Sequence, residues 1–202
     1  MSLLELIADA DERGLAASGL ACLDRCLPPQ EDGSDPEPLR PLWASCETGA
    51  EWATRLDAVL ARLERTGADG ASGNAATAAR VVTLLGAAPR DFAAAPLRAW
   101  ADACSLLALD VHGRFDFPSA TDAETLNRCR EGGPVEGGPL LAGEVRRQAE
   151  ILETLSEGAE TAGGATGLRK VMDVSVEGRR VLRAVMSRRA RGRTRPGGAP
   201  QP

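Results

Sequence analysis

The positions of glycine and proline constrain this chain more than any other feature, because they interrupt an otherwise helical pattern of apolar residues. The interruptions are densest at residues 28–38, 67–73 and 132–139, and a looser glycine-rich stretch covers 158–167. Proline breaks the interior of a helix, and glycine weakens it. Each segment between interruptions has room for one or two helices, which could not bury an apolar face alone. The spacing therefore predicts one domain in which several helices pack together.

The composition favours helices over sheets. Alanine and leucine are the commonest apolar residues, and aromatic residues make up only 3% of the 202 positions. We predict an all-α single domain of about six or seven helices over residues 1–187, in bundle-like or orthogonal packing. The acidic, proline-rich segment 28–41 is expected to be a flexible surface linker. Residues 188–202, rich in Arg, Gly and Pro, are expected to form a disordered tail.

Helical spacing of apolar residues and capping signals define the individual elements. A capping box, Ser or Thr followed three residues later by Glu, opens helices at Ser2, Thr48 and Thr121. A short strand across 174–176 is the alternative for part of the last element. The predicted helices cover approximately residues 2–27, 48–66, 74–85, 96–113, 121–129, 139–155 and 166–187.

Charge is distributed very unevenly along the chain. Residues 166–202 contain ten basic and two acidic side chains, whereas residues 1–165 contain 14 basic and 27 acidic ones. The C-terminal part thus carries a formal charge of +8 and the remainder −13. Such a basic stretch is a candidate surface for an anionic partner. The candidate contacts are Arg179, Arg180, Arg183, Arg188, Arg189, Arg191, Arg193 and Arg195.

Three interpretations of these arginines stay open. They could bind nucleic-acid backbones without sequence specificity, since no aromatic residues interleave with them and no helix-turn-helix or zinc-finger pattern is present. They could dock on acidic segments of a partner protein or of this chain. The simplest interpretation, a solvated helix face followed by a tail, is favoured on frequency because short basic tails are common.

A second candidate surface lies on the last predicted helix. Its valines recur with heptad-like spacing, and a glycine in the same row would let a neighbouring helix approach closely. This seam is a candidate interface for self-association or for a protein partner. It consists of Val171, Val174, Gly178, Val181 and Val185.

The residues that usually carry catalysis or hold metals form no recognisable pattern. Cys22 and Cys26 lie four residues apart but lack zinc-site spacing, so the five cysteines are expected to be reduced and mostly buried. His112, the single histidine, lies too far along a helix from Cys104 to activate it, and is expected to be a cation at a helix C-terminus beside Gly113. We predict no metal, cofactor or catalytic residues.

The predicted function follows from amphipathic helices without a catalytic pattern. Glu5 and Asp9 interrupt the start of the chain, where a signal peptide would be basic and then apolar, and no segment is long and apolar enough to span a membrane. The arginine-rich composition is typical of a high-GC bacterial genome. Taken with the helices and the lack of a catalytic pattern, these features predict a non-catalytic interaction module, an adaptor or regulator, in a bacterial cytoplasm. The alternative is a nucleic-acid-associated protein. An enzyme using cysteine or carboxylate chemistry ranks third, and a pocket for an apolar ligand between the helices stays open.

Overall fold

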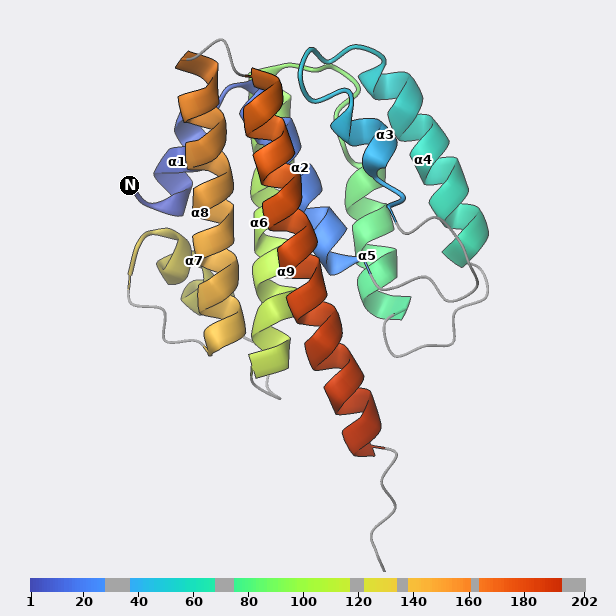
Figure 1. Cartoon of the computed structure of the whole chain (residues 1–202), viewed down its shortest axis with the longest axis vertical. Coiled ribbons are helices and arrows are strands. Elements are labelled where there is room, and N and C mark those ends of the chain that lie inside the picture. Colours follow the sequence, from blue (N-terminus) through green and yellow to red (C-terminus); the bar gives the residue numbers. More distant parts are fainter. Residues whose placement is uncertain (28–36, 68–74, 117–121, 134–137, 161–163, 194–202) are drawn as a thin grey trace, which may run out of the picture.

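The computed structural model describes residues 1–27, 37–67, 75–116, 122–133, 138–160 and 164–193. Every regular element within these ranges is a helix, which confirms the predicted all-α fold (Figure 1). The described helices are α1 (Leu3–Asp9), α2 (Glu12–Cys26), α3 (Arg40–Trp43), α4 (Trp52–Gly67), α5 (Ala75–Gly86), α6 (Ala94–Asp116), α7 (Ala123–Arg130), α8 (Pro139–Glu160) and α9 (Gly164–Arg193).

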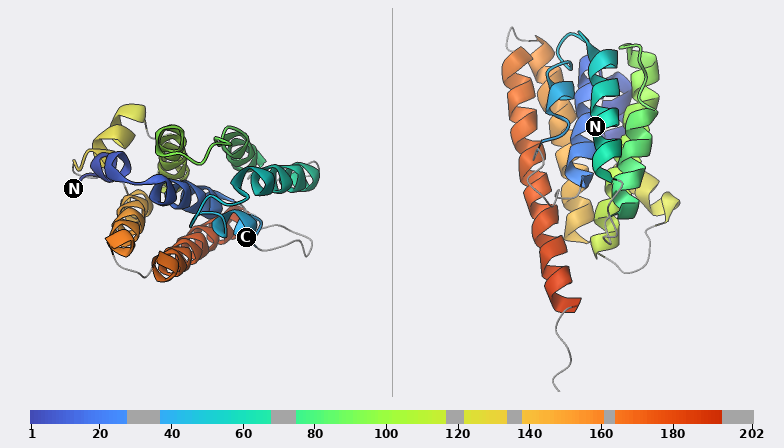
Figure 2. Two further views of the ribbon diagram at one scale, coloured as in Figure 1. Left: turned by 90° about the horizontal axis from the view of Figure 1, so that it is seen from above. Right: turned by 90° about the vertical axis from the view of Figure 1, so that its right-hand side faces the viewer.

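Helix α2 forms the centre of the bundle. All of its residues from Gly14 to Cys26 are buried, and it packs against α6, α8 and α9 (Figure 2). Its small residues allow this close packing, since a Cβ added at Gly19 would lie 2.5 Å from a ring carbon of Trp100 on α6. A helix that is buried on all sides needs neighbours on all sides, and this requirement places α2 between the other elements.

The predicted helix over residues 2–27 is interrupted, which corrects that expectation. Ala10 is extended, and the Asp11 side chain accepts the N–H of Gly14 at 2.7 Å, so that a new helix begins. Asp is a strong N-cap residue and competes with helix continuation at this point. The predicted capping box of Ser2 and Glu5 is confirmed at the start of α1.

Helix α4 starts later than predicted. Glu51 has a φ of 57° and Gly49 a φ of 71°, so the chain turns here and no Thr48 capping box forms. The turn brings Trp52 into the core, where its indole N–H donates to the Pro89 carbonyl at 2.7 Å. Burying this large side chain outweighs the local capping preference.

The structure also changes other predicted boundaries and excludes the predicted strand alternative. Helix α6 continues past Gly113 to Asp116, and α7 is capped by Asp122, whereas Thr121 lies outside the described residues. Residues 174–176 are helical, so the alternative of a strand is wrong. Helix α9 continues to Arg193, through Ala and Arg residues that favour helix, which corrects the predicted end of the last helix at 187; residues 194–202 of the predicted tail lie outside the described residues.

Part of the expected flexible linker is ordered. Residues 37–43 pack on the bundle and include α3, because Leu39, Leu42 and Trp43 are all buried. The hydrophobic gain from these three side chains fixes the segment. The remaining linker residues, 28–36, lie outside the described part of the chain.

Candidate functional site

The C-terminal helix extends beyond the rest of the bundle. Both perpendicular views show the last turns of α9 running past the ends of α6 and α8 (Figures 1 and 2). Arg188 is exposed in this extension, and Arg189, Arg191 and Arg193 belong to the same turns. No acidic residue occurs anywhere after Glu177. The extension therefore carries a run of arginines in sequence, and Arg188, the first of them, is exposed.

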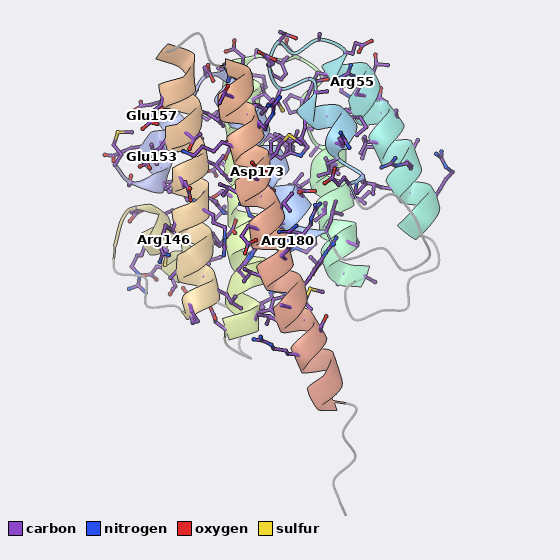
Figure 3. The ribbon with its side chains drawn as sticks, viewed as in Figure 1. Arg55, Arg146, Glu153, Glu157, Asp173 and Arg180 are labelled. Carbon is purple, nitrogen blue, oxygen red and sulfur yellow. The ribbon has the colours of Figure 1, made fainter. Side chains whose placement is uncertain are left out.

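The other predicted arginines lie in different environments. Arg180 is exposed on the outer face of α9, where its Nη1 lies 3.7 Å from Oε2 of Glu177 (Figure 3). Arg183 is partly buried, and burial followed by repulsion from Arg179 lowers its pKa. Arg179 is 7% exposed and donates to Asp24 at 3.0 Å, so its guanidinium is engaged within the chain. Arg195 lies outside the described residues.

The N-terminal part of the valine seam, from Val171 to Gly178, faces the inside of the bundle. Val171 is buried, Val174 is packed against the core, and a Cβ at Gly178 would lie 2.4 Å from Cδ of Arg25. Gly178 thus permits a close helix contact, as predicted from its position in the seam. The helices that approach it are α2 and α8 of the same chain. Val181 and Val185 are only partly buried. These two valines are the part of the seam that leads into the extension.

A fully buried charge network links α2, α6 and α8. The Arg25 guanidinium donates to both carboxylate oxygens of Glu144, with Nη2–Oε1 at 2.5 Å and Nε–Oε2 at 3.0 Å. Gln148 donates to Glu144 at 3.0 Å and accepts from the Ser105 hydroxyl at 2.6 Å. His112 Nε2 lies 3.5 Å from Glu144. These contacts pair the Glu144 carboxylate and the Gln148 amide, whereas Nη1 of Arg25 and Nε2 of His112 are buried without a hydrogen-bond partner among the described residues.

The network sets the protonation of its members. Burial alone would raise the pKa of Glu144, but the Arg25 charge, His112 and the hydrogen bonds from Arg25 and Gln148 lower it to about 2. Burial lowers the pKa of His112. His112 is completely buried, with Nδ1 2.8 Å from the Ala108 carbonyl, so the prediction of a cation at a helix terminus is wrong. The helix continues past it, which removes the terminal position that the prediction assumed.

The partners of this network lie too far apart in the chain to form a recognisable sequence pattern. Arg25 and Glu144 are separated by 119 positions. One signal was available: Glu144 and Gln148 occupy the same helical row as the buried Leu141 and Ile151, where a core helix normally carries apolar residues.

The cysteines are buried thiols, as predicted. Burial, as the largest effect, raises the pKa of Cys22 to about 12 and raises the pKa of Cys104 well above its ordinary value. A thiol in such surroundings is a poor nucleophile, because the thiolate is the reactive form. Over the described residues, no group of three or more His, Cys, Asp or Glu side chains is placed to hold a metal ion.

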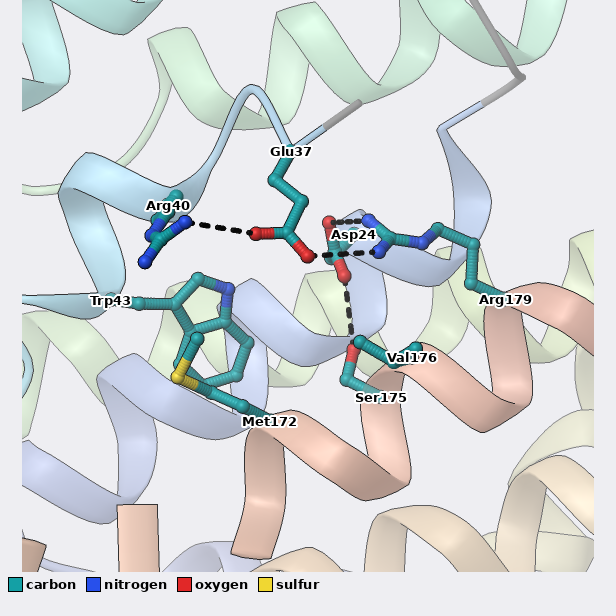
Figure 4. Close-up of a pocket in the computed structure, with 8 residues that line it drawn as sticks. All are labelled: Asp24, Glu37, Arg40, Trp43, Met172, Ser175, Val176 and Arg179. Atoms are coloured by element: carbon teal, nitrogen blue, oxygen red, sulfur yellow. Dashed lines mark hydrogen bonds and ion pairs between the residues drawn. The ribbon is translucent and has the colours of Figure 1, made fainter. Parts of the chain in front are cut away.

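A small pocket lies where the middle of α9 meets the end of α2 and the segment around α3 (Figure 4). Asp24, which is 5% exposed, accepts hydrogen bonds from Arg179 and from the Ser175 hydroxyl, the latter at 3.2 Å. Burial, as the largest effect, raises the pKa of Asp24 despite these partners. The Glu37 carboxylate lies between two guanidinium groups, those of Arg40 and Arg179.

Comparison with known proteins adds no assignment to this geometry. No helix within the described ranges combines the length and apolar character needed to cross a membrane. The chain matches no protein-family model, no curated protein and no solved structure.

Proposed function

We propose that this protein is a non-catalytic interaction module, an adaptor or regulator, whose binding element is the extended C-terminal end of α9. The observation that carries the proposal is the projection of these turns beyond the bundle (Figure 1). Most of α9 packs on the bundle, and its arginine-rich end projects past α6 and α8, where a partner could reach it. The partner we propose is a protein with an acidic surface.

Apolar side chains on the same segment favour a protein over a nucleic acid. Val181 and Val185 are partly exposed, about two turns and one turn respectively before Arg188, the first arginine of the extension. Burying such side chains in a groove of a protein partner is favourable, whereas a phosphate backbone would contact only the arginines. The buried ionisable groups support a non-catalytic role, because Arg25 holds Glu144 and Arg179 holds Asp24 within the chain.

A photocrosslinking experiment tests this proposal. A photoreactive amino acid replaces the exposed Ser187, and the full chain is expressed and irradiated in its native cells. We expect a discrete protein adduct that disappears when the four arginines of the extension are changed to glutamine, a residue that preserves helix propensity. Val181→Asp should also weaken it. The substituted arginines are Arg188, Arg189, Arg191 and Arg193.

The control removes the same number of charges elsewhere on the surface. Four exposed arginines on other elements are changed to glutamine, and the adduct should remain. An adduct that survives loss of the α9 arginines, or that is lost equally in the control, would contradict the proposal. A second copy of this chain is one acceptable partner, because residues 1–165 carry a net charge of −13. The control positions are Arg40, Arg65, Arg128 and Arg146.

Nucleic-acid binding is the second candidate, supported by the lack of any acidic residue after Glu177. Its test is the affinity of the full chain for a labelled duplex DNA across a salt series. If the extension contacts phosphates, the four glutamine substitutions should reduce the salt slope by about 0.9 for each lost contact. No binding at low salt would remove this candidate.

A further inference from the structure

The exposed charges of α8 and α9 differ in sign between the two ends of this helix pair. The helices pack antiparallel, so the C-terminal half of α8 lies beside the N-terminal half of α9 (Figure 1). Among the described side chains of both helices, the exposed acids all lie on these two halves, which we call the acidic end: Glu150, Glu153, Glu157, Asp173 and Glu177. Two exposed bases, Arg169 and Lys170, lie there as well, so this end keeps an excess of negative charge.

The opposite halves of the two helices carry positive charge. Arg146 on α8 and Arg180 and Arg188 on α9 are exposed, and the described part of these halves has no exposed acid (Figure 3). The projecting turns of α9 continue from this basic end. The face formed by α8 and α9 therefore has two ends of opposite charge.

One row of exposed residues on α9 crosses from the acidic end to the basic end. Its members are three or four positions apart, so they share one face of the helix. Ala184, in the basic half of the row, is too small to keep a neighbouring helix away. Position 191 continues the row into the extension by the same spacing. The row consists of Asp173, Glu177, Arg180, Ala184 and Ser187, with Arg188 beside it.

This row is complementary to an antiparallel copy of itself. When Arg180 of each α9 is set opposite Ala184 of the other, Glu177 falls opposite position 187 and Asp173 opposite position 191. Each acid is then next to an arginine position of the second copy, 188 or 191. The two Arg180 residues are offset by about 6 Å along the helix axis, which limits their repulsion. A parallel pairing would instead set like charges opposite one another.

A two-fold axis would form the same contacts twice. The basic end of each copy would lie on the acidic end of the other, so both sets of complementary charges would be used. The projecting turns of α9 fit this arrangement, because they reach past α6 and α8 of their own bundle (Figures 1 and 2). An unrelated acidic protein would fit the basic end alone. Charge complementarity therefore favours a second copy as the partner.

Contacts within the chain do not block this pairing. Glu177 and Arg180 form an ion pair of 3.7 Å, in which the two side chains are 66% and 74% exposed. Exposed pairs of this kind contribute little and exchange readily. Because the pairs between copies are of the same kind, we expect the association to be weak and sensitive to salt.

We propose that the face formed by α8 and α9 binds a second copy of this chain in antiparallel orientation, with the extension of each α9 on the acidic end of the other copy. This inference rests on the function proposed above, and it identifies the acidic partner as the chain itself.

The test is sedimentation equilibrium of the full chain and of two charge-reversed variants. One variant carries Asp173→Arg and Glu177→Arg, and the other carries Arg188→Glu and Arg191→Glu. We expect wild-type dimers at low salt that dissociate as the salt concentration rises. Each variant alone should dimerise at least about ten-fold more weakly, because like charges then meet twice. An equimolar mixture of the two variants should recover the wild-type affinity, since the reversed charges of one then face those of the other.

The matched control reverses two exposed acids outside α8 and α9, with Glu47→Arg and Glu64→Arg, and should leave dimerisation unchanged. Thermal unfolding of each variant verifies that the fold is intact. The inference is overturned by a wild type that stays monomeric at low salt up to about 0.5 mM, by dimers that neither reversal weakens, or by a mixture that recovers nothing. A monomer that still forms the Ser187 adduct with a different protein would overturn this inference and leave the proposed function in place.

Discussion

Removing the cation of the buried network should destabilise the protein strongly. Arg25→Met deletes the guanidinium that contacts both oxygens of Glu144, where both side chains are completely buried. The carboxylate would keep Gln148, a neutral His112 and the longer contact to Arg147, whose Nη1 lies 3.7 Å from Oε2 of Glu144 and whose side chain is partly exposed. Breaking a buried pair in this way costs about 3–5 kcal/mol of unfolding free energy.

The pKa of Glu144 supports the same magnitude. Its environment lowers the value from 4.5 to about 2. A difference of that size corresponds to about 3 kcal/mol in favour of the ionised form, most of which depends on Arg25. For a chain of 202 residues, we expect the Tm of Arg25→Met to fall by about 6–20 °C.

The assay is urea unfolding at pH 7, combined with a double-mutant cycle. Arg25→Met with Glu144→Leu leaves no isolated charge in the core, so the double variant should be more stable than Arg25→Met alone. Arg55→Met is the control, because Arg55 pairs with Glu51 on the surface and its loss should cost less than about 1 kcal/mol. The reasoning is refuted if Arg25→Met costs no more than this control, or if Glu144→Leu brings no recovery.

Three other measurements probe the same core. The unfolding free energy should fall as the pH drops below 6.5, where the unfolded chain takes up a proton at His112, and further below 4.5, where it takes one up at Glu144; the folded chain excludes both protons. Urea titrations between pH 5 and 3 should therefore show that the unfolding free energy of Glu144→Gln depends less on pH than that of the wild type. Gly178→Ala should cost about 1–3 kcal/mol in urea unfolding, since the new methyl group would press on the pinned Arg25, and an unchanged stability would refute this close contact. Iodoacetamide should label the cysteines of the native chain, such as Cys22, far more slowly than a free thiol; one rapidly labelled position would contradict their burial.

Local signals in the sequence located most helices but placed their ends less well. The Ser2 capping box and the first-turn proline of α8 act within a few residues, and the structure confirms both. The N-cap at Asp11 is also a local signal, but the sequence allows either a cap or a continuous helix at this position. The packing of α1 on α6 and α8 favours the break between α1 and α2. The start of α4 was likewise decided by Trp52, whose burial determines the turn before it.

The sequence by itself determined the helical class, the burial of the cysteines and the concentration of positive charge near the C-terminus. These properties depend on composition and on spacing within one helix. Tertiary structure alone decided that Arg179 faces inward to Asp24, that Gly178 accommodates Arg25, and that His112 lies neutral beside Glu144. Each of these depends on residues brought together from distant helices, because a buried charge is tolerated only where the fold supplies its partner.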